Sequence, residues 1–360
     1  MKTWYLNNIK WTTVALVVFY HVCYIFNGVG ILGAIPGSQT LPFFDDCATF
    51  IYPWFMVLMY VVAGIDSWYA LQKKTVRQFL KARTIKLLIP STLGLMVFQW
   101  ITGYAGMLAG GQADLIPPAL RWPIAVLSGT GPLWFVQVLY IYSLLIVLYQ
   151  KLDPENKLRA LCSKANFWVL LALALVIYAS SFVLNLPVLT MYRFGIYFVS
   201  FMIGYLFFSN ENIQQLPARY APWLMSAAIV CGLSYVWLYH GQNFTSDAIL
   251  QSLPTNLYLW LMVLAILGTY QRYFNTPTSF SIWMNKTSYG VYVLHYPILQ
   301  TICYFNVQIF HLPGWLCYLA GFVLVYPLSL LLEEILIRIP LVRVLVLGWS
   351  SKPHQKQISG

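Results

Sequence analysis

The sequence predicts an all-α, polytopic membrane protein with about ten transmembrane helices and with both termini in the cytoplasm. Composition is the first observation: 60% of the 360 residues are hydrophobic, 17% are aromatic and only 9% are charged, which is typical of lipid-solvated helices. Windows of about twenty apolar residues, the length that crosses a bilayer, recur along the whole chain. When successive spans are assigned opposite directions across the membrane, the basic residues also gather on one side.

The first three spans are expected at 11–32, 48–71 and 85–106. The first follows a short basic start, lacks a small-residue cleavage site and contains His21, so it is expected to be a retained span and not a signal peptide. The third leads into the longest outer connection, 107–130, where Gly and Pro residues predict irregular backbone that either frames an external site or is a passive loop.

The remaining spans follow from the same length and hydropathy criterion and are separated by shorter connections. Tryptophans near many span ends fit the aromatic belts of membrane interfaces. No polar block is long enough to form a separate soluble domain, so residues 1–360 are expected to form a single transmembrane domain. In chain order, the other spans are expected at 131–150, 167–186, 190–208, 221–240, 255–271, 288–310 and 314–337.

The distribution of charge predicts the orientation. With these spans, 19 of the 21 Lys and Arg residues fall on one side, which the positive-inside rule makes cytoplasmic, and only Arg121 and Arg193 fall outside. The net charge of +11 therefore reflects topology and attraction to anionic lipid headgroups. No nucleic-acid-binding pattern is visible. The six cysteines show no C-x-x-C pair and no histidine at metal-ligand spacing, so neither a disulfide nor a metal is expected.

Lys10 and His21 are the most informative pair in the chain. Eleven residues of α-helix make roughly 20° more than three full turns, so the two side chains share one face and lie about 16 Å apart along the axis. A cation at headgroup level and a buried imidazole suit a phosphorylated ligand whose reactive end reaches inward. The alternative for His21 is a polar side chain that only hydrogen-bonds between helices.

Segment 73–86 places six cations at the predicted cytoplasmic face. Arg83 and Lys86, spaced i, i+3, lie on one side of a helix that enters the third span and form a plausible anion clamp. The cluster is equally consistent with an ordinary positive-inside signal. Asp66, near the cytoplasmic end of the second span, is expected to neutralise part of this charge.

Five fragments in order resemble the acyltransferase-3 family of integral-membrane acyltransferases, and within it the branch related to periplasmic-glucan succinyltransferases. They are YLNNIKWTTVALVVFYH, in which Lys10 and His21 match a basic residue, ten positions and histidine; YPWFMVLMYVVAGIDSWYAL; FLKARTIKLLIP, similar to an R-x-x-R stretch; GPLWFVQVLYIYSLL, with Trp134 in a Leu-Trp-Phe element; and SYGVYVLHYPI, with a Tyr-x-x-His segment at Tyr292 and His295.

The chain departs from the family pattern at its charged positions. The family has Asp and Arg where this chain has Asn7 and Lys10, and Lys86 replaces the second Arg of R-x-x-R. Positive charge is kept, but bidentate phosphate binding is lost where Lys replaces Arg. The missing acid at position 7 argues against a carboxylate partner for Lys10.

The resemblance implies transfer of an acyl group, acetyl or succinyl, from cytoplasmic acyl-coenzyme A to a hydroxyl of a carbohydrate or other acceptor at the outer face of a bacterial inner membrane. Lys10, Arg83 and Lys86 would bind the coenzyme A phosphates. His21 would act as general base or accept the acyl group covalently. The implied partners are thus acyl-coenzyme A, a hydroxyl acceptor and membrane lipids, with no metal and no nucleic acid.

Four residues are secondary candidates. His295 is expected about two turns into the ninth span, where a donor contact and a packing role are equally consistent with the sequence. Trp134 and Tyr292 lie in the matched fragments, and Arg193 suits either an anionic acceptor, an acyl carbonyl or a lipid phosphate. A transporter or flippase with a midplane site is the competing function, but the two halves show no repeat and no paired broken helices.

Overall fold

The structure is a computed structural model that describes residues 4–31, 33–186 and 191–349. Within these ranges the regular secondary structure is helical, and the sole strand-like feature is an isolated antiparallel bridge between Asn185 and Arg193. The predicted all-α class is therefore confirmed. Six helical segments are long and apolar enough to cross a membrane, and two shorter apolar helices accompany them, which fits a multi-pass protein. Ten spans and two cytoplasmic termini stay predictions.

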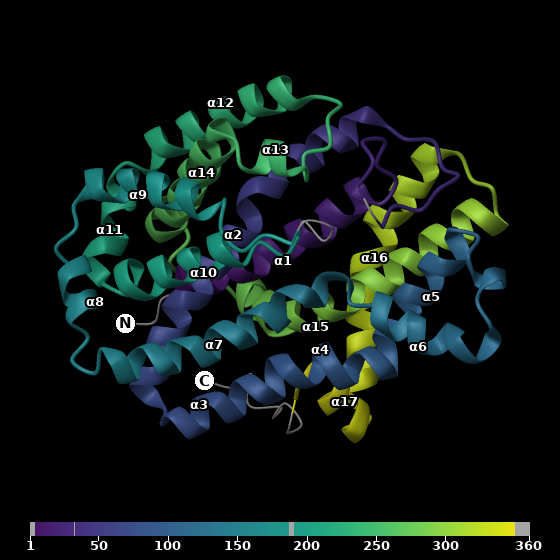
Figure 1. Cartoon of the computed structure of the whole chain (residues 1–360), viewed down its shortest axis with the longest axis horizontal. Coiled ribbons are helices and arrows are strands. Elements are labelled where there is room, and N and C mark those ends of the chain that lie inside the picture. Colours follow the sequence, from purple (N-terminus) through teal and green to yellow (C-terminus); the bar gives the residue numbers. More distant parts are fainter. Residues whose placement is uncertain (1–3, 32, 187–190, 350–360) are drawn as a thin grey trace.

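Helix bounds follow the chain as shown in Figure 1. Three helices continue one another through π-helical segments, so that Val76–Ala109 forms a single long helical segment. In order, the helices are α1 (Trp4–Tyr24), α2 (Pro42–Lys73), α3 (Val76–Arg83), η1 (Thr84–Leu88), α4 (Ile89–Gly94), η2 (Leu95–Gln99), α5 (Trp100–Ala109), η3 (Ala113–Leu115), α6 (Pro118–Ser128), η4 (Gly131–Leu133), α7 (Trp134–Leu152), α8 (Lys157–Cys162), α9 (Phe167–Ser180), α10 (Phe194–Ile203), η5 (Gly204–Phe208), α11 (Glu211–Arg219), α12 (Ala221–Tyr239), α13 (Asp247–Leu250), α14 (Leu253–Tyr273), α15 (Ser279–Tyr304), η6 (Phe305–Ile309), α16 (Gly314–Ile337) and α17 (Pro340–Leu347).

Several predicted bounds are wrong, and local hydrogen bonds explain two of them. The first span was expected to reach residue 32, but α1 ends at Tyr24, where the Asn27 side-chain amide donates to the Tyr24 carbonyl at 3.0 Å. The ninth was expected to begin at residue 288, but α15 begins at Ser279 because Thr278 and Ser281 form a capping box.

The connection 107–130 also differs from the prediction. It was expected to be irregular, yet residues Pro118–Ser128 form α6, with Pro118 in the first turn, where its missing N–H costs nothing. Pro123 lies inside this helix. By contrast, the last span was expected at 314–337, and α16 has these bounds.

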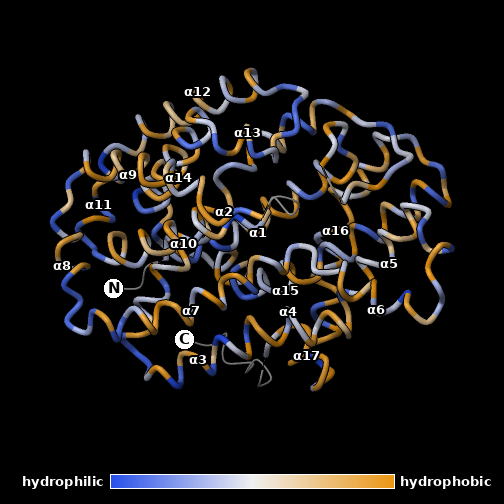
Figure 2. Tube along the Cα trace, viewed as in Figure 1, coloured by the Kyte–Doolittle hydropathy of each residue, from blue (hydrophilic) through white to orange (hydrophobic). Residues whose placement is uncertain are grey.

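α1 is the central helix of the molecule. It contacts α2, α14, α15 and α16, while α2 packs against α10 on its other side. Figure 2 shows that hydrophilic residues gather in the segments around α8 and α13, whereas the helices between are mostly hydrophobic. A buried core of aliphatic and aromatic side chains runs through this central group, and most residues of α1 are buried or half-buried in it.

The two ends of the molecule can be told apart by their contacts. The Tyr5 backbone N–H at the start of α1 donates to Asn275 Oδ1 after α14 at 3.1 Å, and Arg272 near the end of α14 donates to the Arg219 carbonyl at the end of α11 at 3.3 Å. We call this end, where α1 and α15 begin and α2 and α14 end, the basic end. The other is called the opposite end.

The crossing of α2 with α10 and η5 depends on two glycines. A Cβ added at Gly204 would lie 2.0 Å from the Val61 carbonyl oxygen, and one at Gly64 would lie 2.0 Å from the Phe201 carbonyl oxygen. The two backbones therefore touch, as small residues allow in membrane helices.

We expect Gly204→Ala to lower the melting temperature in detergent, because its Cβ meets backbone that cannot give way. Overpacking of this kind costs about 1–3 kcal/mol. The matched control is Gly106→Ala in α5, where an added Cβ meets nothing within 4 Å and alanine favours the helix by about 1 kcal/mol over glycine. A Gly204→Ala protein that melts with the wild type would contradict the close crossing.

Candidate functional site

A cavity of about 280 Å³ lies toward the basic end and is lined by Lys10, Asp66, Arg83 and Lys86. We call it the lysine cavity. The three cations that the sequence placed in one ligand site come from α1, α3 and η1 and are brought together here. Lys286 of α15 lines the same cavity and was not singled out in the sequence, because no other cation lies near it along the chain.

Lys10 has a carboxylate partner, contrary to the expectation drawn from Asn7. Its Nζ lies 2.6 Å from Asp66 Oδ2, while Asn7 Oδ1 is 3.4 Å away. The acid comes from α2, so no spacing within α1 predicts the pair. Asp66 was expected to neutralise part of the charge of segment 73–86; its ion pair is instead with Lys10, although it lines the same cavity as Arg83 and Lys86. With Asp66 paired to Lys10, the lysine cavity keeps a surplus of positive charge.

Arg83 and Lys86 are held by polar and aromatic contacts. Arg83 Nη2 donates to Ser67 Oγ at 3.0 Å. The Lys86 ammonium lies 3.7 Å from the centre of the Tyr289 ring, and the Tyr289 hydroxyl donates to the Lys86 backbone carbonyl. Such a cation–π contact stabilises a charge in a partly dry site. Lys86 lies in the π-helical segment η1, and π segments inside α-helices occur frequently at functional sites.

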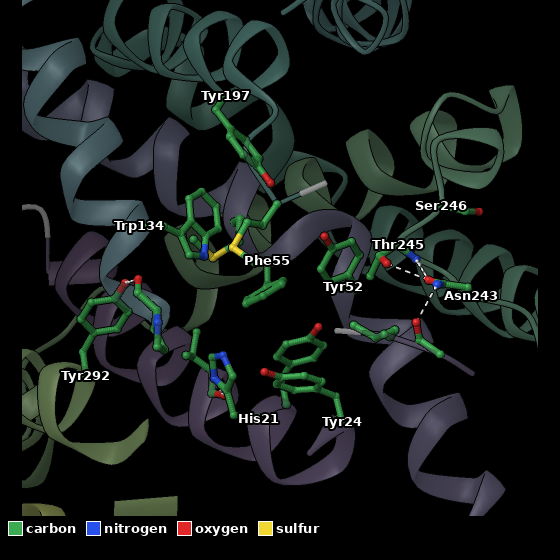
Figure 3. A pocket seen from close by; sticks show the side chains of 17 residues that line it. His21, Tyr24, Tyr52, Phe55, Trp134, Tyr197, Asn243, Thr245, Ser246 and Tyr292 are labelled. Carbon is green, nitrogen blue, oxygen red and sulfur yellow. Dashed lines mark hydrogen bonds between the residues drawn. The ribbon is translucent and has the colours of Figure 1, made fainter. Parts of the chain in front are cut away.

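A second cavity, of about 220 Å³, lies toward the opposite end and contains His21. We call it the histidine cavity. Its aromatic wall includes Trp134 of α7, Tyr197 of α10 and Tyr292 of α15, and Figure 3 shows the His21 ring between Tyr292 and Tyr24. The wall is completed by the segment between α12 and α13 through Asn243, Thr245 and Ser246.

His21 and His295 form a hydrogen-bonded pair that fixes their tautomers. Nδ1 of His295 lies 2.8 Å from the Tyr292 carbonyl, and Nδ1 of His21 lies 2.8 Å from the Val17 carbonyl. Because a carbonyl only accepts, both Nδ1 atoms carry hydrogen in the neutral rings. His295 Nε2, 3.1 Å from His21 Nδ1, is then an acceptor. His21 is left with an unprotonated Nε2, which has no hydrogen-bond partner among the described residues.

The depth of His295 differs from the prediction because α15 begins earlier than expected. His295 lies 16 residues after Ser279, near the middle of the helix, and its side chain is fully buried. Pro297 removes the N–H that would bond the Val293 carbonyl. Gln99 in the π segment η2 replaces this donor, with Nε2 2.6 Å from the Val293 oxygen. The helix is thus held in place around His295.

Tyr292 lines both cavities. Its hydroxyl donates to the Pro132 carbonyl, and its ring lies edge-on to Phe135, with 6.2 Å between ring centres. On α1, Val14 lines the lysine cavity and Val17, one turn later, lines the histidine cavity. The two cavities therefore share a wall that includes Tyr292, and we call this wall the partition.

Tyrosines next to His21 were missed in the sequence. The Tyr24 and Tyr296 hydroxyls hydrogen-bond each other, and Gln300 Nε2 donates to Tyr296 Oη at 3.2 Å. Tyr24 follows His21 by three residues on α1, so helical spacing was a usable signal for it. Asn243 was not predictable in this way, because only the tertiary fold brings its side chain beside Gly30, whose carbonyl it meets at 3.3 Å.

Arg193 does not line either cavity. Its side chain is 3% exposed at the residue before α10, and its Nη2 donates to the Leu250 carbonyl at 3.1 Å.

Comparison with known proteins gives one family and several relatives. A profile of an acyltransferase domain matches residues 3–334. Proteins called glucans biosynthesis protein C are similar to the chain: those of Escherichia coli strain K12 and Shigella boydii serotype 4 are each 22% identical over 393 aligned residues, which cover 99% of this chain and 96% of the relative. No solved structure matches.

Proposed function

Because the chain belongs to the acyltransferase-3 family, we propose that it moves an acyl group from acyl-coenzyme A to a hydroxyl of an extracytoplasmic glycan or related acceptor. The donor binds in the lysine cavity from the cytoplasm, and the acceptor enters the histidine cavity from the other side. Acyl transfer takes place at the partition, next to His21. The protein works in the bacterial inner membrane, with its basic end in the cytoplasm.

The lysine cavity supports a phosphorylated donor. Lys10, Arg83, Lys86 and Lys286 face it, and Asp66 is the only acidic residue among the described residues that line it. Charge-assisted hydrogen bonds from Lys and Arg to phosphate are roughly twice as strong as neutral ones. With its phosphates held there, the thin pantetheine arm of acyl-coenzyme A points along α1 toward His21, and its thioester end crosses the partition between Val14 and Val17 during turnover.

The histidine cavity supports a carbohydrate acceptor. Trp134 and Tyr197 stack with 5.5 Å between ring centres and give an apolar aromatic surface in the same cavity as the hydroxyls of Tyr52 and Thr245 and the amide of Asn243. A sugar presents the same two kinds of surface, the apolar faces of its ring and its outward hydroxyls. The printed names of the relatives refer to glucans, which agrees with this acceptor class.

The reaction proceeds through the free Nε2 of His21. This atom takes the proton of the acceptor hydroxyl as the hydroxyl oxygen attacks the thioester carbonyl. The tetrahedral intermediate then breaks its C–S bond, and the proton passes from His21 to the leaving thiolate, so the products are an ester and coenzyme A thiol. His295 Nε2 and the Val17 carbonyl both accept from His21 Nδ1–H and stabilise the imidazolium that forms between the two steps.

The observation that carries this proposal is the meeting of a cationic cavity and a histidine cavity at Tyr292. The test is binding and turnover of acetyl- and succinyl-coenzyme A by the purified protein in detergent, with and without glucan. Saturable binding and glucan-dependent release of coenzyme A thiol are expected. Folded protein that binds neither thioester would rule the function out.

We expect His295→Leu to lower kcat by about 10- to 100-fold with little change in the KM for the donor. The loss should be smaller than if His21 lost both acceptors of its Nδ1–H. In the variant the Val17 carbonyl still accepts from Nδ1–H and keeps the His21 tautomer. His295→Gln, which keeps one acceptor and one donor, should recover part of the rate. Wild-type kcat in the leucine variant would show that His295 is a packing residue.

A further inference from the structure

Arg193 is a buried cation without an acidic partner. Its side chain is 3% exposed, its Nη2 has the Leu250 carbonyl as partner, and its Nε has none. None of the salt bridges found in the described part of the chain includes it. A buried charge is unfavourable unless something compensates it. A neutral side chain with an N–H could make the hydrogen bond to the Leu250 carbonyl equally well. The positive charge of Arg193 therefore needs another explanation.

The charge of Arg193 acts on hydroxyls of the histidine cavity. It interacts electrostatically with Tyr52 and Tyr197, and both line the cavity. Figure 3 shows the Tyr197 hydroxyl directed into the cavity, on the side of Tyr52. Neither hydroxyl makes a hydrogen bond to any residue that the structure describes. A cation near a hydroxyl attracts the oxygen lone pairs, so the O–H points away from the cation and can donate to a ligand.

The rest of the cavity wall is also suited to an anion. Its described lining contains no Asp or Glu, and Asn243 and Thr245 add polar groups at its rim. The Arg193 contact to Leu250 also ties α10 to the chain that follows Ser246, so the cation and the rim are held together. Positive potential, two free hydroxyls and no acidic side chain together favour a negatively charged ligand group over a neutral one.

We propose that the histidine cavity contains a carboxylate subsite, formed by the Tyr52 and Tyr197 hydroxyls under the influence of the nearby Arg193 charge. The subsite is separate from His21 and from the phosphate-binding cations of the lysine cavity. Its physiological occupant rests on the proposed function: the carboxylate belongs either to an acyl group that ends in its own acid or to an anionic acceptor. Arg193 is a positioning residue here, because it acts through the two tyrosines.

The first test uses small ligands and needs no turnover. Melting temperatures of the purified protein are measured with succinate and with its neutral analogue succinamide, at equal ionic strength. Succinate should raise the melting temperature of the wild type, and succinamide should not. Arg193→Gln should lose the shift and Arg193→Lys should keep most of it. The matched control is Arg121→Gln, the other outer cation, which is paired with exposed Asp114 and should respond as wild type. Equal shifts from the two ligands in the wild type would overturn the subsite even if Arg193→Gln does not fold.

The second test distinguishes the two sources of the carboxylate. If the acyl group carries it, Arg193→Gln should lower kcat/KM at least 10-fold for succinyl-coenzyme A and leave acetyl-coenzyme A unchanged. If the acceptor carries it, both donors should lose equally, and only with an anionic acceptor. No loss in either arm would overturn the proposal. A wild type that binds succinate but uses neither donor would instead remove the acyltransfer reaction and leave the subsite standing.

Discussion

Replacing His21 with alanine is expected to lower the rate of acyl transfer by roughly 10²- to 10⁴-fold, the range that a general base contributes. The structure gives the reason: His21 is the only histidine on the wall of the histidine cavity among the described residues, and its Nε2 is left without a partner by the bonds at Nδ1. Binding of coenzyme A should be unchanged, because the cations proposed to bind its phosphates lie in the other cavity. The measurement is kcat and donor affinity on the same preparation.

His240→Ala is the matched control for this variant. His240 is exposed and pairs with Asp46 at 2.8 Å, away from both cavities. Its removal should leave kcat within about twofold of the wild type, since surface ion pairs contribute little. A folded His21→Ala protein with wild-type turnover would exclude both the general-base and the covalent role of His21.

The double variant Lys10→Gln/Lys86→Gln should weaken coenzyme A binding by roughly 10²- to 10⁴-fold, because each hydrogen bond to a charged group contributes about 1.5–3 kcal/mol. The affinity of the variant for coenzyme A should depend less on salt concentration than the affinity of the wild type, since two phosphate contacts are lost. Equilibrium binding of coenzyme A at several salt concentrations measures both effects.

Lys73→Gln/Lys74→Gln removes the same charge from the basic end without touching the cavity. Both lysines are exposed and neither lines it, so affinity at physiological salt should fall less than threefold. Equal losses of affinity for coenzyme A in the two double variants would mean that the lysines attract it through the net positive charge of the basic end, and that the lysine cavity is not the phosphate site.

Periodicity within one helix was the most reliable guide in the sequence. Lys10 and His21 lie on one continuous helix, as the spacing required, because α1 runs unbroken from Trp4 to Tyr24. The bounds of α16 also agree with the hydropathy window. Both features, the unbroken helix α1 and the bounds of α16, are decided by residues close together in the sequence, so a single sequence is enough to predict them.

The contacts that shape the cavities depend on tertiary structure and were not visible. Asp66 reaches Lys10 from another helix, and His295 reaches His21 from a position 274 residues later. The two π segments of Val76–Ala109 have no composition that separates them from the α-helix around them. Their effect, the placing of Lys86 and Gln99 against α15, appears only when the helices are packed together.

The partition at Tyr292 also has an electrical consequence. In the proposed arrangement each cavity opens to one side of the membrane and admits water and ions, so the membrane voltage would fall mainly across the short stretch that includes Tyr292, His21 and His295. Moving one elementary charge through 100 mV involves about 2.3 kcal/mol. A neutral acetyl group passes this point without electrical work, whereas an acyl group that ends in a carboxylate is driven outward by an inside-negative potential. Voltage would then accelerate the transfer of one donor and leave the other unchanged.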